Sequence, residues 1–127
     1  MDKAAFLAYA RDRYGAEPEN PFSTDFDGFI FRHAHNRKWY AVEMEVPRSK
    51  LGLEGEEIVP FVCLKCGPLI GGSFQGERGV VPAWHMNKNH WIGVLLNGTA
   101  EAETLQALLE ISYELTNGKN KRSRAPE

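Results

Sequence analysis

Cysteine is scarce in this sequence, since the 127 residues contain only Cys63 and Cys66. Two cysteines cannot form the disulfide framework of a small secreted protein. Their C-x2-C spacing, with His85 and His90 further along the chain, does follow the order of zinc-finger ligands. Positions three apart in a strand point to opposite faces, so the two thiols can share an ion only if the strand ends between them. We expect two reduced, metal-free thiols, and a zinc site and a reactive dithiol stay open as alternatives.

Long apolar runs are also missing. Runs such as Ile58 to Cys63 are far shorter than the roughly 18 residues that a membrane-spanning helix needs. The first residues, Met1-Asp2-Lys3, do not open a signal peptide. We therefore expect a cytoplasmic protein that makes no contact with a membrane.

The chain has no large excess of charge of one sign. Its 15 basic and 17 acidic residues give a net charge of −2 and a pI near 6.1, which excludes a protein that coats nucleic acid through bulk positive charge. The basic residues are unevenly placed, because residues 31–50 hold five of them against two acids. This distribution allows a local anion-binding face, with an unevenly charged solvated surface as the alternative. Residues 119–127 hold four bases and one acid, and we expect a flexible basic tail there.

The residues that are present suit one globular domain. Hydrophobic residues make up 43% of the chain and charged residues 25%, both near the average of soluble domains. A chain of this length supports a single core, so residues 1–118 are expected to form one domain.

Periodicity, caps and turn residues predict the elements in chain order. A helix is expected over residues 3–14, with Asp2 as N-cap and Gly15 after its end. A hairpin (28–33 and 39–46), a strand (58–66), a short helix (68–75) and two strands (80–84 and 90–96) follow. The last helix is expected to have Thr99 as N-cap and to end at Asn117-Gly118. The order α-β-β-β-α-β-β-α predicts an α+β two-layer sandwich, in which helices cover one face of an antiparallel sheet and the other face meets solvent.

The apolar pattern predicts which side chains form the core. One cluster is expected to join the last helix to the sheet, made by Tyr40, Val42, Ile92, Val94, Leu96, Leu105, Leu108 and Leu109. Glu43 and Glu45 alternate with apolar residues along one strand, which indicates a solvated strand face. A pair of catalytic carboxylates is the alternative for these two glutamates.

The densest group of polar and aromatic residues is Trp84-His85-Met86-Asn87-Lys88-Asn89-His90-Trp91, between the last two predicted strands. It supplies hydrogen-bond donors, a cation and stacking surfaces, as an anionic or heterocyclic ligand requires. The alternative is a rigid loop whose His and Asn side chains satisfy backbone groups. No serine lies in a G-x-S-x-G setting, and the segment 71–76 lacks the lysine of a P-loop, so we expect no enzymatic activity and no cofactor.

Five segments together resemble the MmcQ/YjbR-like family of small bacterial proteins. They are Phe31-Arg32-His33, Lys38-Trp39-Tyr40-Ala41, Leu64-Lys65-Cys66-Gly67-Pro68, the run from Pro82 to Ile92, and Ser112-Tyr113-Glu114-Leu115. The resemblance implies bacterial origin and an α+β fold similar to that of type III secretion chaperones. It also implies a "double wing" DNA-binding motif, and it implies neither an enzymatic activity nor a cofactor.

The leading hypothesis is therefore a small DNA-binding protein. Phosphates would be contacted by Arg32, Arg37, Lys38, Lys65 and Lys88. Stacking or base-edge contacts would come from Trp84, His85, Asn87, His90 and Trp91. Two alternatives remain: a protein-interaction module resembling a secretion chaperone, which uses the open sheet face or a dimer interface, and a small-molecule site at the loop from His85 to Trp91. We expect a monomer or a weak dimer.

Overall fold

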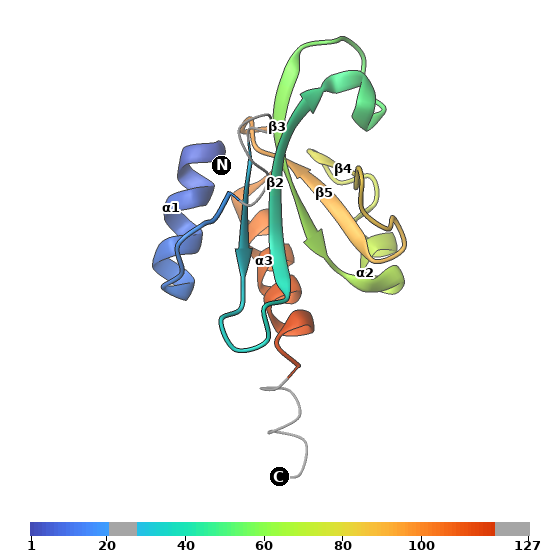
Figure 1. Cartoon of the computed structure of the whole chain (residues 1–127). Coiled ribbons are helices and arrows are strands. Elements are labelled where there is room, and N and C mark those ends of the chain that lie inside the picture. The colour runs from blue at the N-terminus through green and yellow to red at the C-terminus, as the bar shows by residue number, and fades with distance from the viewer. Residues whose placement is uncertain (21–27, 119–127) are drawn as a thin grey trace.

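The computed structural model describes residues 1–20 and 28–118, and the predicted basic tail lies outside them. The elements follow the predicted order (Figure 1). The helices are α1 (Lys3–Tyr14), α2 (Gly67–Phe74) and α3 (Ala102–Thr116), and a 3-10 helix η1 spans Arg48–Leu51. The strands are β1 (Phe29–Arg32), β2 (Trp39–Pro47), β3 (Ile58–Lys65), β4 (Val80–Pro82) and β5 (Trp91–Leu95). The α+β prediction is confirmed.

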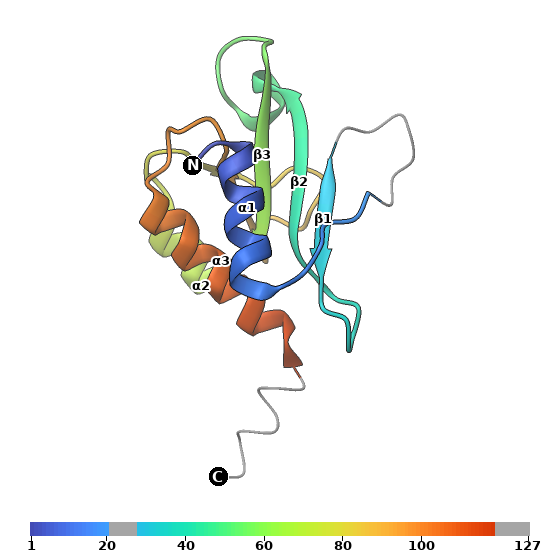
Figure 2. The same ribbon diagram turned by 90° about the vertical axis from the view of Figure 1, so that its left-hand side faces the viewer.

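The five strands form one antiparallel sheet in the order β1-β2-β3-β5-β4. The central strand β3 aligns Cys63 with Val42 of β2 on one side and with Gly93 of β5 on the other. Helices α1 and α3 cover one face of this sheet (Figure 2). The predicted caps of α1 are confirmed, because Asp2 Oδ1 accepts a hydrogen bond from the Ala5 N–H at 2.8 Å and Gly15 ends the helix in the left-handed region.

The helix-covered face holds the first apolar cluster, which contains seven of the eight predicted core residues. The exception is Val42, which lies on the opposite face. A register shift explains this error, because β1 pairs Phe31 with Ala41 and then Arg32 with Trp39. The bulge leaves Tyr40 without a partner in β1, so Tyr40 and Ala41 both join the helix-side cluster and simple alternation fails.

The other face of the sheet does not meet solvent as predicted. It carries a second apolar cluster, which includes Phe61, Cys63 and Leu95. Leu51 at the end of η1 belongs to this cluster, and half-buried Trp84 and Met86 pack against it from the loop between β4 and β5. The sheet therefore has an apolar layer on both faces, and the loop singled out in the sequence helps to cover the second.

Two further predictions are wrong. Glu43 is not solvated, because its side chain is fully buried on the helix side of β2, where Lys3 of α1 lies above it. Thr99 does not cap α3, which begins at Ala102 with Glu101 as N-cap. The Thr99 hydroxyl instead donates to Asn97 Oδ1 at 2.6 Å, in a turn that precedes the helix. Among the described residues, no helix is long and apolar enough to span a bilayer.

Candidate functional site

The loop between β4 and β5 is held by its own polar groups. Asn87 Oδ1 accepts the Asn89 N–H at 2.8 Å, and the Asn87 carbonyl accepts the N–H groups of His90 and Trp91 at 3.0 and 2.9 Å. The His90 carbonyl accepts the Cys66 N–H at 2.8 Å, which fastens the loop to the start of α2. These hydrogen bonds hold the backbone on both sides of Lys88.

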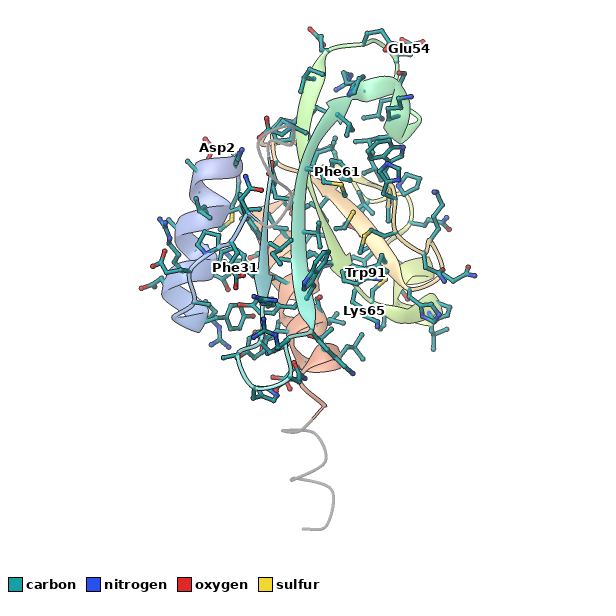
Figure 3. All side chains as sticks on the ribbon, viewed as in Figure 1. Asp2, Phe31, Glu54, Phe61, Lys65 and Trp91 are labelled. Carbon is teal, nitrogen blue, oxygen red and sulfur yellow. The ribbon has the colours of Figure 1, made fainter. Side chains whose placement is uncertain are left out.

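Strand register brings a cation to a tryptophan beside this loop. Lys65 of β3 pairs with Trp91 of β5, and the two labelled side chains lie next to each other in Figure 3. The Lys65 ammonium is 5.9 Å from the centroid of the Trp91 ring, within the range of a cation–π contact. Trp91 is half-buried, so part of its ring is available to a ligand.

Trp91 also lines a pocket of about 480 Å³ between α2 and the edge of the sheet. Lys88 and Asn89 form one wall, and the backbone of Gly71 and Gly72 in α2 forms part of another. None of the described residues that line this pocket is an aspartate or a glutamate. We call Lys65, Lys88, Asn89 and Trp91 the Trp91 site. Lys88, Asn89 and Trp91 line the pocket, and Lys65 lies beside Trp91 outside this lining.

The other predicted phosphate contacts lie elsewhere. Arg32 is bound by Glu19 through two contacts, from Nε at 3.0 Å and from Nη2 at 2.8 Å. Arg32 and Arg37 line a second pocket, on the helix side of the molecule. Lys38 is exposed in the turn between β1 and β2, where its N–H donates to Asn36 Oδ1. The predicted cations therefore do not form one continuous surface.

The aromatic and imidazole residues of the loop have different surroundings. Trp84 is half-buried against the second apolar cluster, with its ring centroid 3.8 Å from that of His85. His85 adopts a left-handed backbone conformation with φ of 65°, and the side chains of His85 and His90 are exposed. Trp84 therefore has a packing role, whereas both histidines are open to a ligand.

The two cysteines lie in different clusters, Cys63 on the second face and Cys66 on the helix-covered face. Burial raises the pKa of the Cys63 thiol to about 12, so this side chain stays protonated and unreactive at neutral pH. In the part of the chain that the structure describes, no three His, Cys, Asp or Glu side chains are grouped so that they could hold a metal ion.

Sequence reasoning missed two groups of residues. One is an aromatic group made by Tyr14 of α1, Tyr40 of β2 and Tyr113 of α3 with His33, which follows β1; the three tyrosines are far apart in the sequence. The other is the buried Glu43 beneath Lys3. A glutamate within an apolar strand was the only available signal, and it equally fits an exposed strand face.

Comparisons with known proteins agree with this fold. The family model described as YjbR matches residues 11–115. The uncharacterized protein YyaQ of Bacillus subtilis (strain 168) is 33% identical over 116 residues, which cover 91% of this chain and 98% of YyaQ.

Solved structures show the same likeness. A crystal structure of a Pseudomonas syringae protein has a TM-score of 0.87 and 42% identity, and covers 92% of this chain and 100% of its own. A Deinococcus radiodurans protein, described with the domain name DUF419, has a TM-score of 0.64 and 25% identity over 94% of this chain and 82% of its own. The chain is therefore a member of the YjbR family.

Proposed function

We propose that this protein binds DNA through the Trp91 site, with a preference for single strands. The observation that carries the proposal is the position of Lys65 over the ring of Trp91, beside an acid-free pocket that Lys88 also lines. Proteins that bind single strands combine cations that follow the backbone with aromatic rings on which bases stack. In a duplex the bases already stack on each other, so a half-buried indole ring favours an unpaired strand.

The charge of the whole chain fits a small contact area. With a net charge of −2, general attraction to a polyanion is weak, so affinity depends on the few cations that converge. The YjbR-like resemblance, which implies DNA binding, also supports this function. Lys65 and Lys88 would contact phosphates, while Asn89 and Trp91 would meet a base.

The salt dependence of binding tests this assignment. Lys88→Gln is expected to weaken binding of a fluorescent oligothymidine and to reduce the slope of log affinity against log salt by about 0.7, because one phosphate contact is lost. Lys65→Gln should have a similar effect, and the double variant should show roughly twice the change in slope. Fluorescence anisotropy at several salt concentrations measures these slopes, and thermal melts check that each variant folds.

Lys50→Gln is the matched control, because Lys50 is an exposed lysine of η1 outside the Trp91 site. The control should bind as tightly as the unchanged protein. Equal losses for Lys50→Gln and Lys88→Gln would show that binding depends on general charge. If the unchanged protein does not bind the oligonucleotide at low salt, where electrostatic attraction is greatest, DNA binding is excluded.

The second candidate function is binding of a small anion in the same pocket. Its volume of about 480 Å³ lies in the range of small-molecule sites and favours this reading. Oligonucleotide length separates the two functions. Affinity should rise with length if a strand is bound across Lys65 and Lys88, whereas a site for a small anion gains nothing beyond the first nucleotide.

A further inference from the structure

A second pocket, of about 540 Å³, lies at the C-terminal end of α1, opposite the end that carries Lys3. Figure 2 shows that the end of α1, the turn between β1 and β2 and the last turns of α3 come together at one end of the molecule. We call this the tyrosine pocket, and its argument rests on six of its lining residues: Tyr14, His33, His35, Arg37, Tyr40 and Tyr113. None of them belongs to the Trp91 site.

The aromatic residues of the tyrosine pocket support each other. Tyr14 and Tyr113 stack with ring centroids 4.1 Å apart, and Tyr40 meets Tyr113 edge to face at 4.9 Å. The ring of His33 lies 4.8 Å from that of Tyr40 and 4.6 Å from that of Tyr113. The rings of Tyr14 and Tyr113 are half-buried, so the pocket offers an aromatic wall to a planar ligand.

One hydroxyl in this wall lacks a partner. Tyr40 is 1% exposed, and its Oη has no hydrogen bond to any residue that the structure describes. The Tyr14 hydroxyl, in contrast, donates to Glu110 Oε1 at 2.9 Å. Buried polar groups are almost always paired, so an unpaired donor on a pocket wall indicates an acceptor that arrives with a ligand. Burial raises the pKa of Tyr40, which keeps this hydroxyl protonated and able to donate.

His33 adds no charge to the interior of the pocket. Its Nε2 lies 2.7 Å from Thr116 Oγ1, and the Thr116 hydroxyl donates to the Ser112 carbonyl at 2.8 Å. Because the Thr116 hydroxyl donates its proton to the Ser112 carbonyl, Thr116 Oγ1 accepts in its hydrogen bond with His33. His33 Nε2 is therefore the donor. Burial and nearby His35 lower the pKa of His33, which agrees with a neutral ring. The interior therefore consists of uncharged rings and suits an uncharged part of a ligand.

The rim of the pocket has unbalanced positive charge. Its two acids are already paired, because Glu17 binds Arg11 at 3.1 Å and Glu19 binds Arg32 at 2.8 Å. Arg37 is exposed and forms no ion pair with any described residue. Its φ of 65° places it in the left-handed region, which is unusual for a residue with a side chain. An anionic group at the rim would thus meet a free guanidinium.

We propose that the tyrosine pocket binds a small anion that carries an aromatic ring, of the nucleoside monophosphate class. The base lies against the half-buried rings of Tyr14 and Tyr113, and a shift of these rings on binding lets it accept a hydrogen bond from Tyr40 Oη. The phosphate lies at the rim and is bound by Arg37. This ligand site is separate from the DNA contact, and its occupancy does not require the Trp91 site.

An NMR titration of the full chain tests the proposal, with adenosine 5′-monophosphate as the probe. The expected result is saturable shifts of the backbone amides of Gly15, Ala34 and His35. Arg37→Gln should weaken binding about tenfold, and Tyr40→Phe about three- to tenfold, because each removes one hydrogen bond to the ligand. Tyr40→Phe should not lower the melting temperature of the free protein, since the hydroxyl that it removes has no partner there. Arg78→Gln, at an exposed arginine outside the pocket, is the control and should bind as the unchanged chain does.

Four results would overturn the proposal. The first is the absence of saturable shifts up to about 10 mM nucleotide, because a dissociation constant above that concentration is too weak for a specific site of this size. The second is a set of shifts confined to Asn89 and Trp91, which would assign the nucleotide to the Trp91 site. The third is unchanged affinity in both Arg37→Gln and Tyr40→Phe. Adenosine and inorganic phosphate, titrated separately, should each bind at least tenfold more weakly than the complete nucleotide, and equal binding of either would also contradict the proposed division of contacts.

Discussion

Raising the pH from about 5 to 9 is expected to lower the free energy of unfolding by roughly 4 kcal/mol, because Glu43 must then ionise in its buried position. The Glu43 side chain is fully buried, and neither carboxylate oxygen has a hydrogen-bond partner among the described residues. Burial raises the pKa of Glu43 to about 8, with a smaller contribution in the same direction from Glu45. Lys3 acts in the opposite direction, with its ammonium 3.7 Å from Glu43 Oε1.

The sign of this effect follows from proton binding. An unfolded glutamate has a pKa of about 4.3, so between about pH 4.3 and 8 the folded protein holds a proton that the unfolded chain has lost. The stabilisation is fully present below the unfolded pKa and is lost as the pH rises through the folded one. The loss is about 1.4 kcal/mol per pH unit in this window.

Glu43→Gln isolates the effect, because an amide resembles the protonated acid and does not ionise. Urea unfolding at pH 5, 7 and 9 should show similar stability of the two proteins at pH 5, and the variant should be more stable by several kcal/mol at pH 9. Glu57→Gln, at an exposed glutamate, should keep the pH dependence of the unchanged chain. Lys3→Met should raise the upper limit of the window, since it removes the cation that lowers the pKa of Glu43 in the folded protein. Parallel stability curves for the unchanged protein and Glu43→Gln would contradict the assignment.

Leu108→Ala is expected to cost about 2 to 5 kcal/mol in unfolding free energy. Leu108 is fully buried on α3 and belongs to the cluster between this helix and the sheet. Truncation removes its transfer free energy and leaves a cavity that the well-packed surroundings only partly fill. Urea denaturation with an unchanged slope against denaturant measures the loss.

Leu69→Ala is the matched control for this truncation. Leu69 lies on α2 and is 84% exposed, so the same change in chemistry should alter stability by less than about 0.5 kcal/mol. If the two substitutions lowered the unfolding free energy by similar amounts, burial of the leucine side chain would not determine the size of the loss. A loss below about 0.5 kcal/mol for Leu108→Ala would show that α3 does not pack on the sheet as described.

The elements were predictable because their signals are local. Asp2 and Gly15 mark the ends of α1 within the sequence itself, and β1 and β2 are short alternating segments separated by a polar turn. Residue type alone could not reveal the bulge at Tyr40, which reverses the alternation for one residue. The burial of Glu43 depends on the docking of Lys3 from a helix about 40 positions away, and no periodicity within β2 carries that information.

The candidate site was predictable only as a set of residue types. Lys88 and Trp91 are near each other in the sequence, but the approach of Lys65 to Trp91 requires the pairing of β3 with β5. From the sequence alone, Arg32 and Lys65 are equally good candidates for a phosphate contact. Its ion pair with Glu19 distinguishes Arg32 from Lys65, and that contact arises because Glu19 forms an antiparallel bridge with Ile30 of β1.

Under the proposed function, the loop between β4 and β5 couples recognition to local unfolding. It presents Lys88 and also covers the second apolar cluster with Trp84 and Met86. When the loop opens, apolar surface is exposed and the hydrogen bond from the Cys66 N–H to the His90 carbonyl breaks. Amide hydrogen exchange at Cys66 therefore reports how often the loop opens, and a partner that binds only the closed loop should slow this exchange in proportion to its occupancy.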